Sequence, residues 1–364
     1  MISVKDVARA AGVALALLLV AGAARADTHA PWPTDWNNWN DPALWVTVAN
    51  KGNTGELSGS GAGAGGYGPD RICGAVGYTF NMGKFEVTAG QYTAFLNAVG
   101  ATDTYGLYNT KLWSSGYGCN IQRTDTGSGY TYSVAADWAN RPVNHVSWGD
   151  AARFANWLTQ GQPTGAQNAS TTEDGSYYLN GATSDEALLA VVRKSPEQGG
   201  RYYIPTEDEW YKAAYHKNDG MTGNYFDYPT VSDSAPSNDL VNPDPGNNAN
   251  FTASYPDDST IDGPYYRTEV GEFENSESPY GTFDQGGNVW EWNEAILYFA
   301  SCRGLRGGSF GPTVDGGYLH AAFRYYYYPK YESYGVGFRV SEVPEPATLA
   351  LLAVGGLVAL RRRR

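Results

Sequence analysis

The stretch Gly281–Trp292 limits what this chain can fold into more than any other segment. Asp284, Asn288 and Glu291 place three oxygen-bearing side chains within eight residues, and the pair Gly286-Gly287 lets the backbone turn tightly between them. Oxygen ligands on a bent loop suit a hard cation such as calcium better than zinc or copper. The tryptophans near its end are large apolar anchors that would fix such a loop to a hydrophobic core.

Six short motifs follow one another in an order that resembles the formylglycine-generating enzyme (sulfatase-modifying factor) family. They are Gly83–Thr88, Arg141–Trp148, Ile204–Trp210, Gly281–Trp292, Arg306–Ser309 and Gly337–Val340. That family also includes the ergothioneine-synthase and pyoverdine-maturation relatives. The resemblance covers roughly Tyr78 to Ser341. It implies an α+β, C-type-lectin-like (formylglycine-generating-enzyme) fold with long irregular loops and little regular secondary structure.

The two ends of the chain and these motifs set the expected domain boundaries. We expect a signal peptide over 1–26, an N-terminal extension with a Gly-rich loop over 27–77, a sulfatase-modifying-factor-like domain over 78–342 and a sorting tail over 343–364. The first segment has Lys5 and Arg9, an apolar run and the cleavage pattern Ala24-Arg-Ala26. An N-terminal membrane anchor is the less favoured alternative, because the apolar run is short.

The C-terminal residues combine Pro344-Glu345-Pro346 with an apolar stretch over 347–360 and four arginines. At about 1.5 Å per residue this stretch reaches about 21 Å, short of a hydrocarbon core of about 30 Å. The pattern resembles a PEP-CTERM sorting signal, which implies a transient inner-membrane anchor that an exosortase removes. We therefore expect the protein in the periplasm, on the outer surface or in the extracellular matrix of a bacterium with an exosortase. An ordinary membrane anchor is the alternative.

The body between these ends is strongly acidic. The formal charge is −13, and removing 1–26, which carry +2, and 347–364, which carry +4, lowers it to −19. A body of this charge without a basic patch is not expected to bind nucleic acid. Cys73, Cys119 and Cys302 lie in the exported part, where one disulfide is permitted, and the sequence does not tell which two pair.

Three helices are predicted by one signal, a Thr or Ser followed three residues later by Gln, Asp or Glu. They begin after Thr88, Ser147 and Thr206. The runs 202–204 and 337–341 are expected as strands. Residues 218–279 are rich in Asn, Asp, Pro and Gly and are expected to be irregular, and the Gly-rich residues 58–68 to be a flexible loop or linker.

The resemblance implies two structural calcium sites in these irregular loops. The first would use the side chains of Asn250 and Asp262 with the Phe251 carbonyl. The second would use Asp284, the carbonyls of Gly287 and Val289, and Glu291. Metal-free turns are the alternative at both, with Asn and Asp turn chemistry at the first and Glu291 bonded to the backbone at the second.

This chain departs from the family pattern at the copper site of the oxidases. Oxidase members of the family hold copper(I) with two cysteines a few residues after Arg-Gly-Gly-Ser, since soft thiolates select this ion. The corresponding segment Phe310–Gly317 contains no cysteine, and Cys302 precedes the motif. Copper is not expected, and the catalytic residues stay unknown. A non-haem iron site with His145 and His320 as ligands is the enzyme alternative.

A ligand groove is the remaining candidate site. Arg306, Ser309, Arg324 and Tyr326 are assigned to it. Both of these arginines, with Arg339, are also expected to form bidentate bonds to carboxylates. The aromatic run 323–328 would expose alternate tyrosines as a platform for sugars or peptides. Alternating strand packing without a ligand is the favoured alternative for this run.

These features indicate an exported, surface-sorted family member that lacks the copper-binding cysteines and binds a surface polysaccharide or a protein. The alternatives are a non-haem metal-dependent oxidoreductase of the same superfamily and a structural matrix component. Metal analysis separates the enzyme from the binding module, and a glycan array separates binding from a scaffold role. The sequence identifies neither the ligand, nor the oligomeric state, nor any residual enzyme activity.

Overall fold

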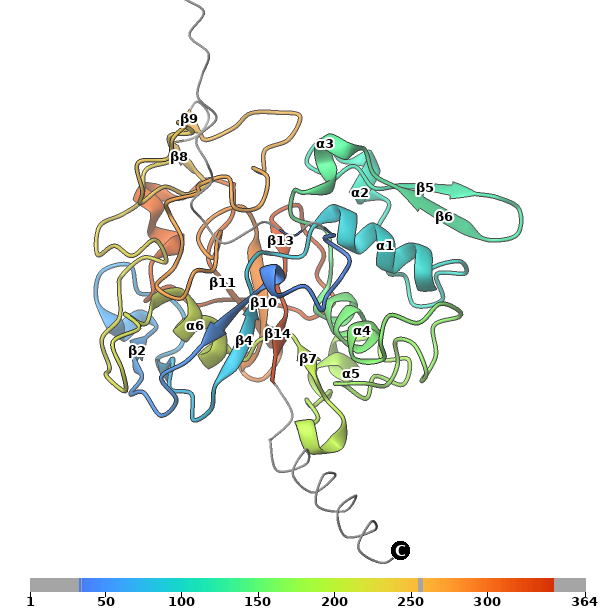
Figure 1. Cartoon of the computed structure of the whole chain (residues 1–364), viewed down its shortest axis with the longest axis horizontal. Coiled ribbons are helices and arrows are strands. Elements are labelled where there is room, and N and C mark those ends of the chain that lie inside the picture. Colours follow the sequence, from blue (N-terminus) through green and yellow to red (C-terminus); the bar gives the residue numbers. More distant parts are fainter. Residues whose placement is uncertain (1–32, 34, 255–257, 344–364) are drawn as a thin grey trace, which may run out of the picture. The chain divides into compact units, whose positions relative to one another are not determined.

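Figure 1 shows the computed structural model, which describes residue 33 and residues 35–254 and 258–343. The expected signal peptide and the motif Pro344-Glu345-Pro346 lie outside these residues. In the described part, helices are few and short, sheets are small and the remainder is irregular, which confirms the α+β prediction. The helices are α1 (Ala89–Val99), α2 (Lys111–Ser114), α3 (Ala136–Ala139), α4 (Trp148–Thr159), α5 (Asp185–Leu189) and α6 (Glu207–Tyr215). Single 3-10 turns are η1 (Pro42–Leu44), η2 (Ser60–Ala62), η3 (Pro196–Gln198) and η4 (Val314–Leu319).

Two four-stranded sheets form the centre of the fold. One has the order β1 (Trp45–Val48), β4 (Phe80–Gly83), β14 (Ser341–Glu342) and β7 (Tyr202–Tyr203). The other has the order β12 (Tyr325–Tyr327), β11 (Cys302–Arg306), β10 (Trp290–Leu297) and β13 (Val336–Gly337). Three hairpins complete the list: β2 (Glu56–Ser58) with β3 (Arg71–Cys73), β5 (Gln122–Asp125) with β6 (Tyr130–Ser133), and β8 (Thr252–Ser254) with β9 (Asp258–Ser259).

The run 337–341, predicted as one strand, joins the two sheets. Its start belongs to β13, which pairs in parallel with β10, and its end belongs to β14, which pairs with β4 and β7. The residues between them still bond across the junction, because Val87 N donates to Phe338 O and Gly83 N donates to Val340 O. A single extended segment therefore fixes the position of one sheet relative to the other.

The three predicted helices all form, and their predicted starts are confirmed. Thr88, Ser147 and Thr206 each cap a helix through a complete capping box. The first helix ends at Gly100, as predicted. The buried face of α1 meets that of α4, where the rings of Phe95 and Phe154 lie 5.2 Å apart in an edge-to-face contact.

The N-terminal extension is part of the domain and not a loose appendage. β1 pairs with β4 from Trp45↔Gly83 to Val48↔Phe80 and so forms the edge of a central sheet. The Gly-rich residues 58–68, expected to be a flexible loop or linker, are hydrogen-bonded in place. Gly59 and Tyr67 both donate backbone hydrogen bonds to Ala322 O, at 3.0 and 3.4 Å. Glycines here allow close backbone approach to another segment, a use that composition alone does not reveal.

The long segment 218–279 is largely irregular, as predicted, and holds only β8 and β9 as named strands within the residues described. Of the helices in residues 35–343 that the structure describes, none has the length and apolar character required to cross a bilayer. The apolar stretch 347–360 lies outside that range.

We expect Ser147→Ala to lower the free energy of unfolding by about 1 kcal/mol, because the Ser147 hydroxyl accepts from the Asp150 backbone at 3.1 Å and donates to its carboxylate at 2.7 Å. Urea denaturation measures this change. Ser128→Ala, an exposed serine in the β5–β6 turn, is the matched control and should leave stability unchanged. Equal stability of the two variants would contradict the assignment of the cap.

Candidate functional site

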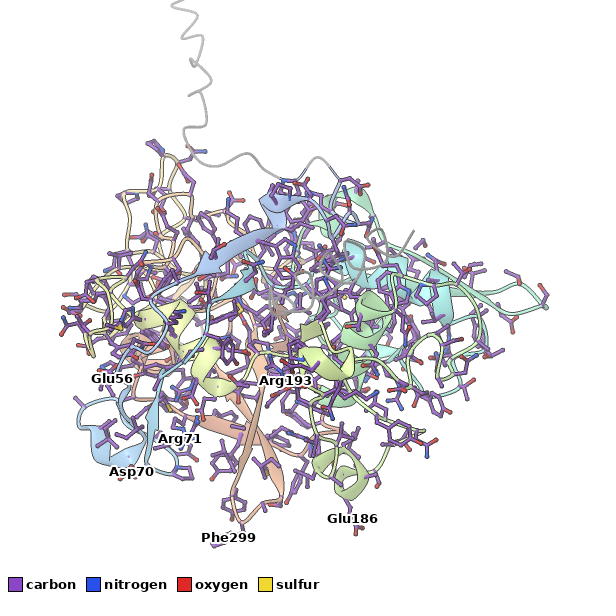
Figure 2. All side chains as sticks on the ribbon, turned by 60° about the horizontal axis from the view of Figure 1, so that its bottom comes forward. Glu56, Asp70, Arg71, Glu186, Arg193 and Phe299 are labelled. Atoms are coloured by element: carbon purple, nitrogen blue, oxygen red, sulfur yellow. The ribbon has the colours of Figure 1, made fainter. Side chains whose placement is uncertain are left out.

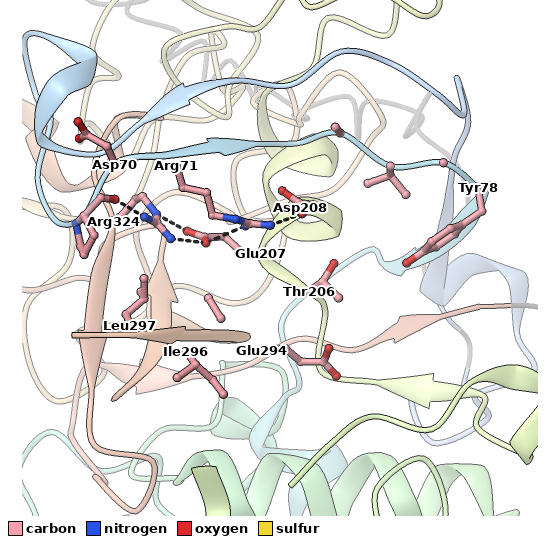
Figure 3. A pocket seen from close by; sticks show the side chains of 15 residues that line it. Asp70, Arg71, Tyr78, Thr206, Glu207, Asp208, Glu294, Ile296, Leu297 and Arg324 are labelled. Carbon is pink, nitrogen blue, oxygen red and sulfur yellow. Dashed lines mark hydrogen bonds and ion pairs between the residues drawn. The ribbon is translucent and has the colours of Figure 1, made fainter. Parts of the chain in front are cut away.

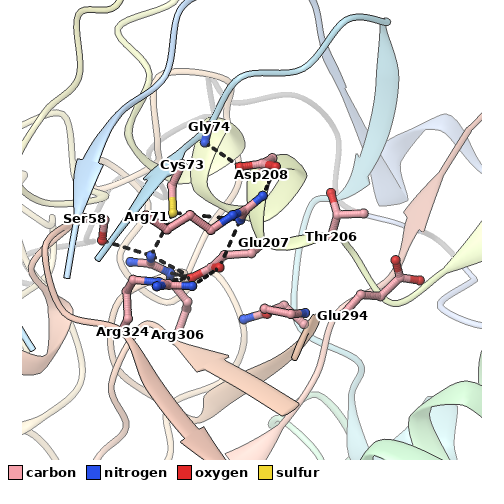
Figure 4. A network of polar contacts seen from close by, with 12 residues as sticks. Ser58, Arg71, Cys73, Gly74, Thr206, Glu207, Asp208, Glu294, Arg306 and Arg324 are labelled. Carbon is pink, nitrogen blue, oxygen red and sulfur yellow. Dashed lines mark hydrogen bonds and ion pairs between the residues drawn. The ribbon is translucent and has the colours of Figure 1, made fainter. Parts of the chain in front are cut away.

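The side chain of Glu207, at the first position of α6, lies at the centre of a buried charge cluster (Figure 4). Arg306 donates to its Oε1 from Nε at 3.0 Å and from Nη2 at 2.8 Å. Arg324 bonds both carboxylate oxygens, at 2.8 and 2.6 Å. Arg71 adds a contact of 3.0 Å to Oε2 and is 40% exposed, whereas the other three side chains are buried. One carboxylate thus holds three guanidinium groups together.

The charge state of Glu207 follows from these neighbours. Burial by itself raises the pKa of this carboxyl group, but the combined attraction of Arg306, Arg324 and Arg71 outweighs burial and holds the pKa at about 2. The predicted pairing of arginines with carboxylates is confirmed here, with a fork-to-fork geometry for Arg324 and two nitrogens on one oxygen for Arg306. Arg306 and Arg324, two of the four predicted groove residues, therefore form buried ion pairs.

A cleft of about 650 Å³ opens beside this cluster (Figure 3). Residues 69–78 form one wall and the end of β10 forms the other, with the start of α6 between them. Arg71 lines this cleft and bridges Glu207 and Asp208, so the positive charge of Arg71 is already compensated. The cleft therefore presents fixed and paired polar groups beside the apolar side chains of Ile296 and Leu297.

The predicted calcium ligand Glu291 is saturated with protein donors. Arg339 donates to its two oxygens at 2.6 and 2.7 Å, and Trp210 Nε1 donates to the same carboxylate at 2.7 Å. Both Glu291 and Arg339 are buried. The pairing predicted for Arg339 is confirmed. Glu291 bonds to these side chains and not to the backbone that the metal-free alternative named.

Glu86 and Asp284 lie beside this ion pair with weaker compensation. Glu86 is buried and accepts at 3.4 Å from Val289 N, and at 3.4 Å from the Asn288 amide. Burial, and then repulsion by Asp284 and Glu291, raises the pKa of Glu86 well above its ordinary value. Burial also raises the pKa of Asp284 to about 7, although its carboxylate accepts from Gly271 N at 2.6 Å. The sequence analysis missed Glu86, and its place inside the motif Gly83–Thr88 was the available signal.

The residues of the first predicted calcium site bond to protein groups. Asn250 Nδ2 donates to Asn288 Oδ1 at 2.7 Å and to Tyr266 O at 3.1 Å. The Phe251 carbonyl accepts from the Thr260 hydroxyl at 3.0 Å. Asp262 is exposed. These bonds join separate segments and are not the local Asn or Asp turn bonds named as the alternative, and calcium at this site stays a prediction.

No metal site stands out from the side chains alone. Within residues 35–254 and 258–343, no three His, Cys, Asp or Glu side chains lie together in a way that could hold a metal ion. The carbonyls of Gly287 and Val289 are on the same turn as Asp284, so backbone oxygens would have to complete any calcium shell there.

The two histidines proposed for iron have different surroundings. His145 is buried, its φ is 51°, and neither ring nitrogen has a hydrogen-bond partner. Burial, with the charges of Arg267 and Lys111, lowers its pKa to about 4, so its ring is neutral at physiological pH. His320 Nδ1 instead accepts from the Ala322 backbone at 3.0 Å. Iron binding by these residues stays a prediction, and among the described residues neither histidine belongs to a group of three His, Cys, Asp or Glu side chains that could hold a metal.

All three cysteines are free and buried. Cys73 lies 3.5 Å from Arg306 Nη2, in a cluster with Trp210 and Tyr211, whereas Cys119 belongs to the main core. Burial raises the pKa of Cys73 to about 11 and also raises the pKa of Cys119 and of Cys302. The disulfide that the compartment permits is not formed, and each thiol is held in its protonated form at neutral pH.

Four aromatic rings surround the start of the segment Phe310–Gly317, and we call them the aromatic face. They are Tyr117, Tyr266, Phe310 and Tyr334. Tyr117 touches the other three, with ring centroids 4.7 to 6.1 Å apart. Tyr117 and Tyr334 are each 44% exposed, so two of the rings present apolar surface to solvent.

Ser309 and Tyr326, the other two predicted groove residues, occupy different places in the fold. Ser309 is buried, and its hydroxyl accepts from Gly311 N at 3.3 Å, directly before the aromatic face. Tyr326 stacks on Tyr298 at 5.0 Å, near the turn between β10 and β11. Phe299 projects from that turn and is 95% exposed (Figure 2). The predicted groove residues therefore do not line one common surface.

Replacing Glu207 by Gln should lower the free energy of unfolding by about 3–5 kcal/mol, because three guanidinium groups lose their common counter-charge. The folded-state pKa lies below the ordinary value of 4.5, so the contribution is complete above that value and is lost as the pH falls towards 2. The difference between wild type and variant in urea denaturation should thus be smaller near pH 3 than at neutral pH. Glu186→Gln, at an exposed position, is the matched control. A pH-independent difference would rule out this electrostatic account.

Comparisons with known proteins agree with the motifs. The chain matches the sulfatase-modifying factor enzyme 1-like domain over residues 75–343 and the PEP-CTERM protein-sorting motif over residues 342–364. A comparison with curated proteins finds no match.

Three solved structures are similar to this chain, each covering 82% of it. They are CarF (21% identity, 98% of that chain, TM-score 0.44), Treponema denticola variable protein 1 (17%, 95%, 0.47) and PvdO from Pseudomonas aeruginosa (18%, 94%, 0.44). Because the domain match spans most of the chain, this protein belongs to the sulfatase-modifying factor enzyme 1-like family and carries a PEP-CTERM sorting motif.

Proposed function

We propose that this protein is an exported, surface-sorted member of the family that binds a polysaccharide on the aromatic face and does not carry out copper-oxidase chemistry. The observation behind the proposal is the segment Phe310–Gly317. It has no cysteine where the oxidases place their thiolates, and aromatic rings surround its start. The sorting motif supports export, and delivery to the outer surface is part of the proposal.

The cysteines elsewhere in the chain do not replace the missing pair. A copper(I) site of the oxidase type needs two thiolates at one place. Cys73 and Cys119 belong to separate buried clusters, and Cys302 begins β11, before the motif that precedes the oxidase site. Since burial raises the pKa of all three thiols, each is a poor source of thiolate at neutral pH.

Exposed tyrosine rings and overall charge favour a neutral polysaccharide as ligand. Tyr117 and Tyr334 combine an apolar ring with a hydroxyl group, which is the combination that stacks on sugar rings and bonds their hydroxyls. The charge of −19 would repel acidic polymers. A protein ligand would use the same rings but would require a larger complementary surface.

We expect the mature protein to bind neutral polysaccharides on a glycan array, and Tyr117→Ala or Tyr334→Ala to weaken binding by roughly tenfold, as the loss of about 1.4 kcal/mol of ring stacking implies. Isothermal titration with the best polysaccharide measures this loss. Tyr178→Ala is the matched control, since Tyr178 is 59% exposed but lies outside the aromatic face. Binding that both face variants retain in full would contradict the site, and capture of a protein with no glycan signal would contradict the ligand class.

We also propose calcium as a structural ion at the second predicted site. Asp284 and Glu86 are the carboxylates with raised pKa values there, and the carbonyls of Gly287 and Val289 are available on the same turn. Glu291 already accepts three bonds from Arg339 and Trp210, so it would contribute less than the family pattern implies. A divalent cation would relieve the repulsion between the two carboxylates.

This proposal predicts that calcium stabilises the protein more at pH 8 than at pH 5. The folded-state pKa of Asp284, about 7, lies above its ordinary value, so without metal its contribution to stability falls as the pH rises towards 7. Calcium competes with that proton and adds about 2.7 kcal/mol at a hundredfold excess over Kd. Melting curves with calcium and with chelator measure the effect, and Asp284→Asn should abolish most of it.

Asp239→Asn, at an exposed loop position, is the matched control and should keep the calcium response. Melting curves that coincide with and without chelator at both pH values would show that the turn closes without metal, as the alternative states.

A further inference from the structure

A second pocket, of about 860 Å³, opens where the described chain ends, and we call it the exit pocket. It is lined by Lys51, Gly77, Tyr78, Thr79, Arg193, Lys194, Ser195, Pro196, Glu197 and Val343. Val343 is thus both the last described residue and part of the pocket wall. The residue that follows it is Pro344, the start of the sorting motif.

The chain reaches this wall in a fixed position. β14 pairs with β7 at Ser341↔Tyr203 and Glu342↔Tyr202. The Val343 backbone then donates to Arg201 O at 3.1 Å. Sheet pairing therefore holds the chain up to Val343, the residue before the motif.

The charges of the exit pocket are opposite to those of the motif. Its lining has three cationic side chains and one carboxylate, Glu197, on a body whose charge is −19. Residues 344–364 contain a single acidic residue, Glu345. An extended chain advances about 3.1 Å per residue, so two residues can reach about 6 Å beyond Val343.

The three cations of the exit pocket differ in exposure and in how far they are already paired. Arg193 is already paired with both oxygens of Glu209, at 2.9 and 3.0 Å. Lys194 pairs with Asp174 but remains 27% exposed. Lys51 is exposed and forms no ion pair with any residue that the structure describes. Lys51 and Lys194 are therefore the groups that a carboxylate entering the pocket would meet.

The backbone of the motif is suited to such a pocket. Prolines fix their own φ and restrict the residue before them to extended conformations, which applies to Val343 and to Glu345. An extended proline segment loses little entropy when it docks on aromatic surface. The pocket offers Tyr78, which is 41% exposed, for this contact.

We propose that the exit pocket binds the chain's own Pro344-Glu345-Pro346, with the Glu345 carboxylate between Lys51 and Lys194. A motif held there is covered by the domain, so docking slows its processing by the exosortase. This inference goes beyond ligand binding on the aromatic face and does not depend on it.

Cross-linking of the full chain in membranes tests the contact. A photoreactive residue at position 347, next to the motif, should cross-link within the same molecule to residues 77–79 or 193–197, as mass spectrometry of the linked peptides shows. The same residue at position 299, on the exposed β10–β11 turn, is the control and should not link to them. Links only to lipid, to other proteins or to a second copy of the chain would overturn the proposal.

Processing in a host with an exosortase tests the consequence. The double variant Lys51→Glu, Lys194→Glu should lose its tail roughly two- to tenfold faster than wild type in a pulse-chase experiment, the range expected from two partly exposed ion pairs. Lys111→Glu, Lys330→Glu is the matched control, because both lysines are exposed and outside the pocket. If the double variant misfolds, Lys51→Ala alone, which breaks no described ion pair, should still accelerate processing. An unchanged or slower rate in Lys51→Ala would overturn the proposal.

Discussion

The attraction between one buried carboxylate and three guanidinium groups determines where the elements around the cleft lie. Glu207 starts α6, Arg71 starts β3, Arg306 ends β11 and Arg324 precedes β12. Each charge loses water when these four segments meet, and for Glu207 the attraction of the arginines outweighs burial and lowers its pKa to about 2. Because the Arg306 guanidinium group also donates to Ser58 Oγ and to the carbonyls of Ala321 and Phe323, the Gly-rich segment is tied to the same point.

The second charge cluster has more carboxylates than arginines, the reverse of the cluster at Glu207. The carboxylates of Glu86, Asp284 and Glu291 are attracted by one arginine, Arg339, whose guanidinium group bonds to Glu291. The remaining two carboxylates bear the cost of burial, which is why their pKa values are raised. This weaker compensation is the basis for proposing a cation at Glu86 and Asp284, whereas the carboxylate of Glu207 is fully compensated by its arginines. The difference lies in the count of arginines around each site and not in the presence of carboxylates.

Local signals in the sequence predicted the helix starts, but they did not predict which distant groups would meet. Capping boxes at Thr88, Ser147 and Thr206 depend on residues three positions apart, so the sequence contains the whole interaction. The pairing of arginines with carboxylates was also predictable as a type of bond. The partner Glu207 and the buried carboxylate Glu86 were not, because each contact joins segments about a hundred or more residues apart. The Gly-rich residues 58–68 were read as flexible for the same reason, since Ala322 fixes them.

The same contacts explain why the family motifs identify the fold better than they identify an activity. Arg306-Gly-Gly-Ser and Gly-Phe-Arg339-Val each supply the cationic half of a buried ion pair, and the motifs that contain Glu207 and Glu291 supply the acidic halves. Losing either half would leave an unpaired buried charge and lower the free energy of unfolding by about 3–5 kcal/mol. In this chain both ion pairs form although the segment Phe310–Gly317 contains no cysteine, so the contacts that hold the fold do not depend on a thiol there.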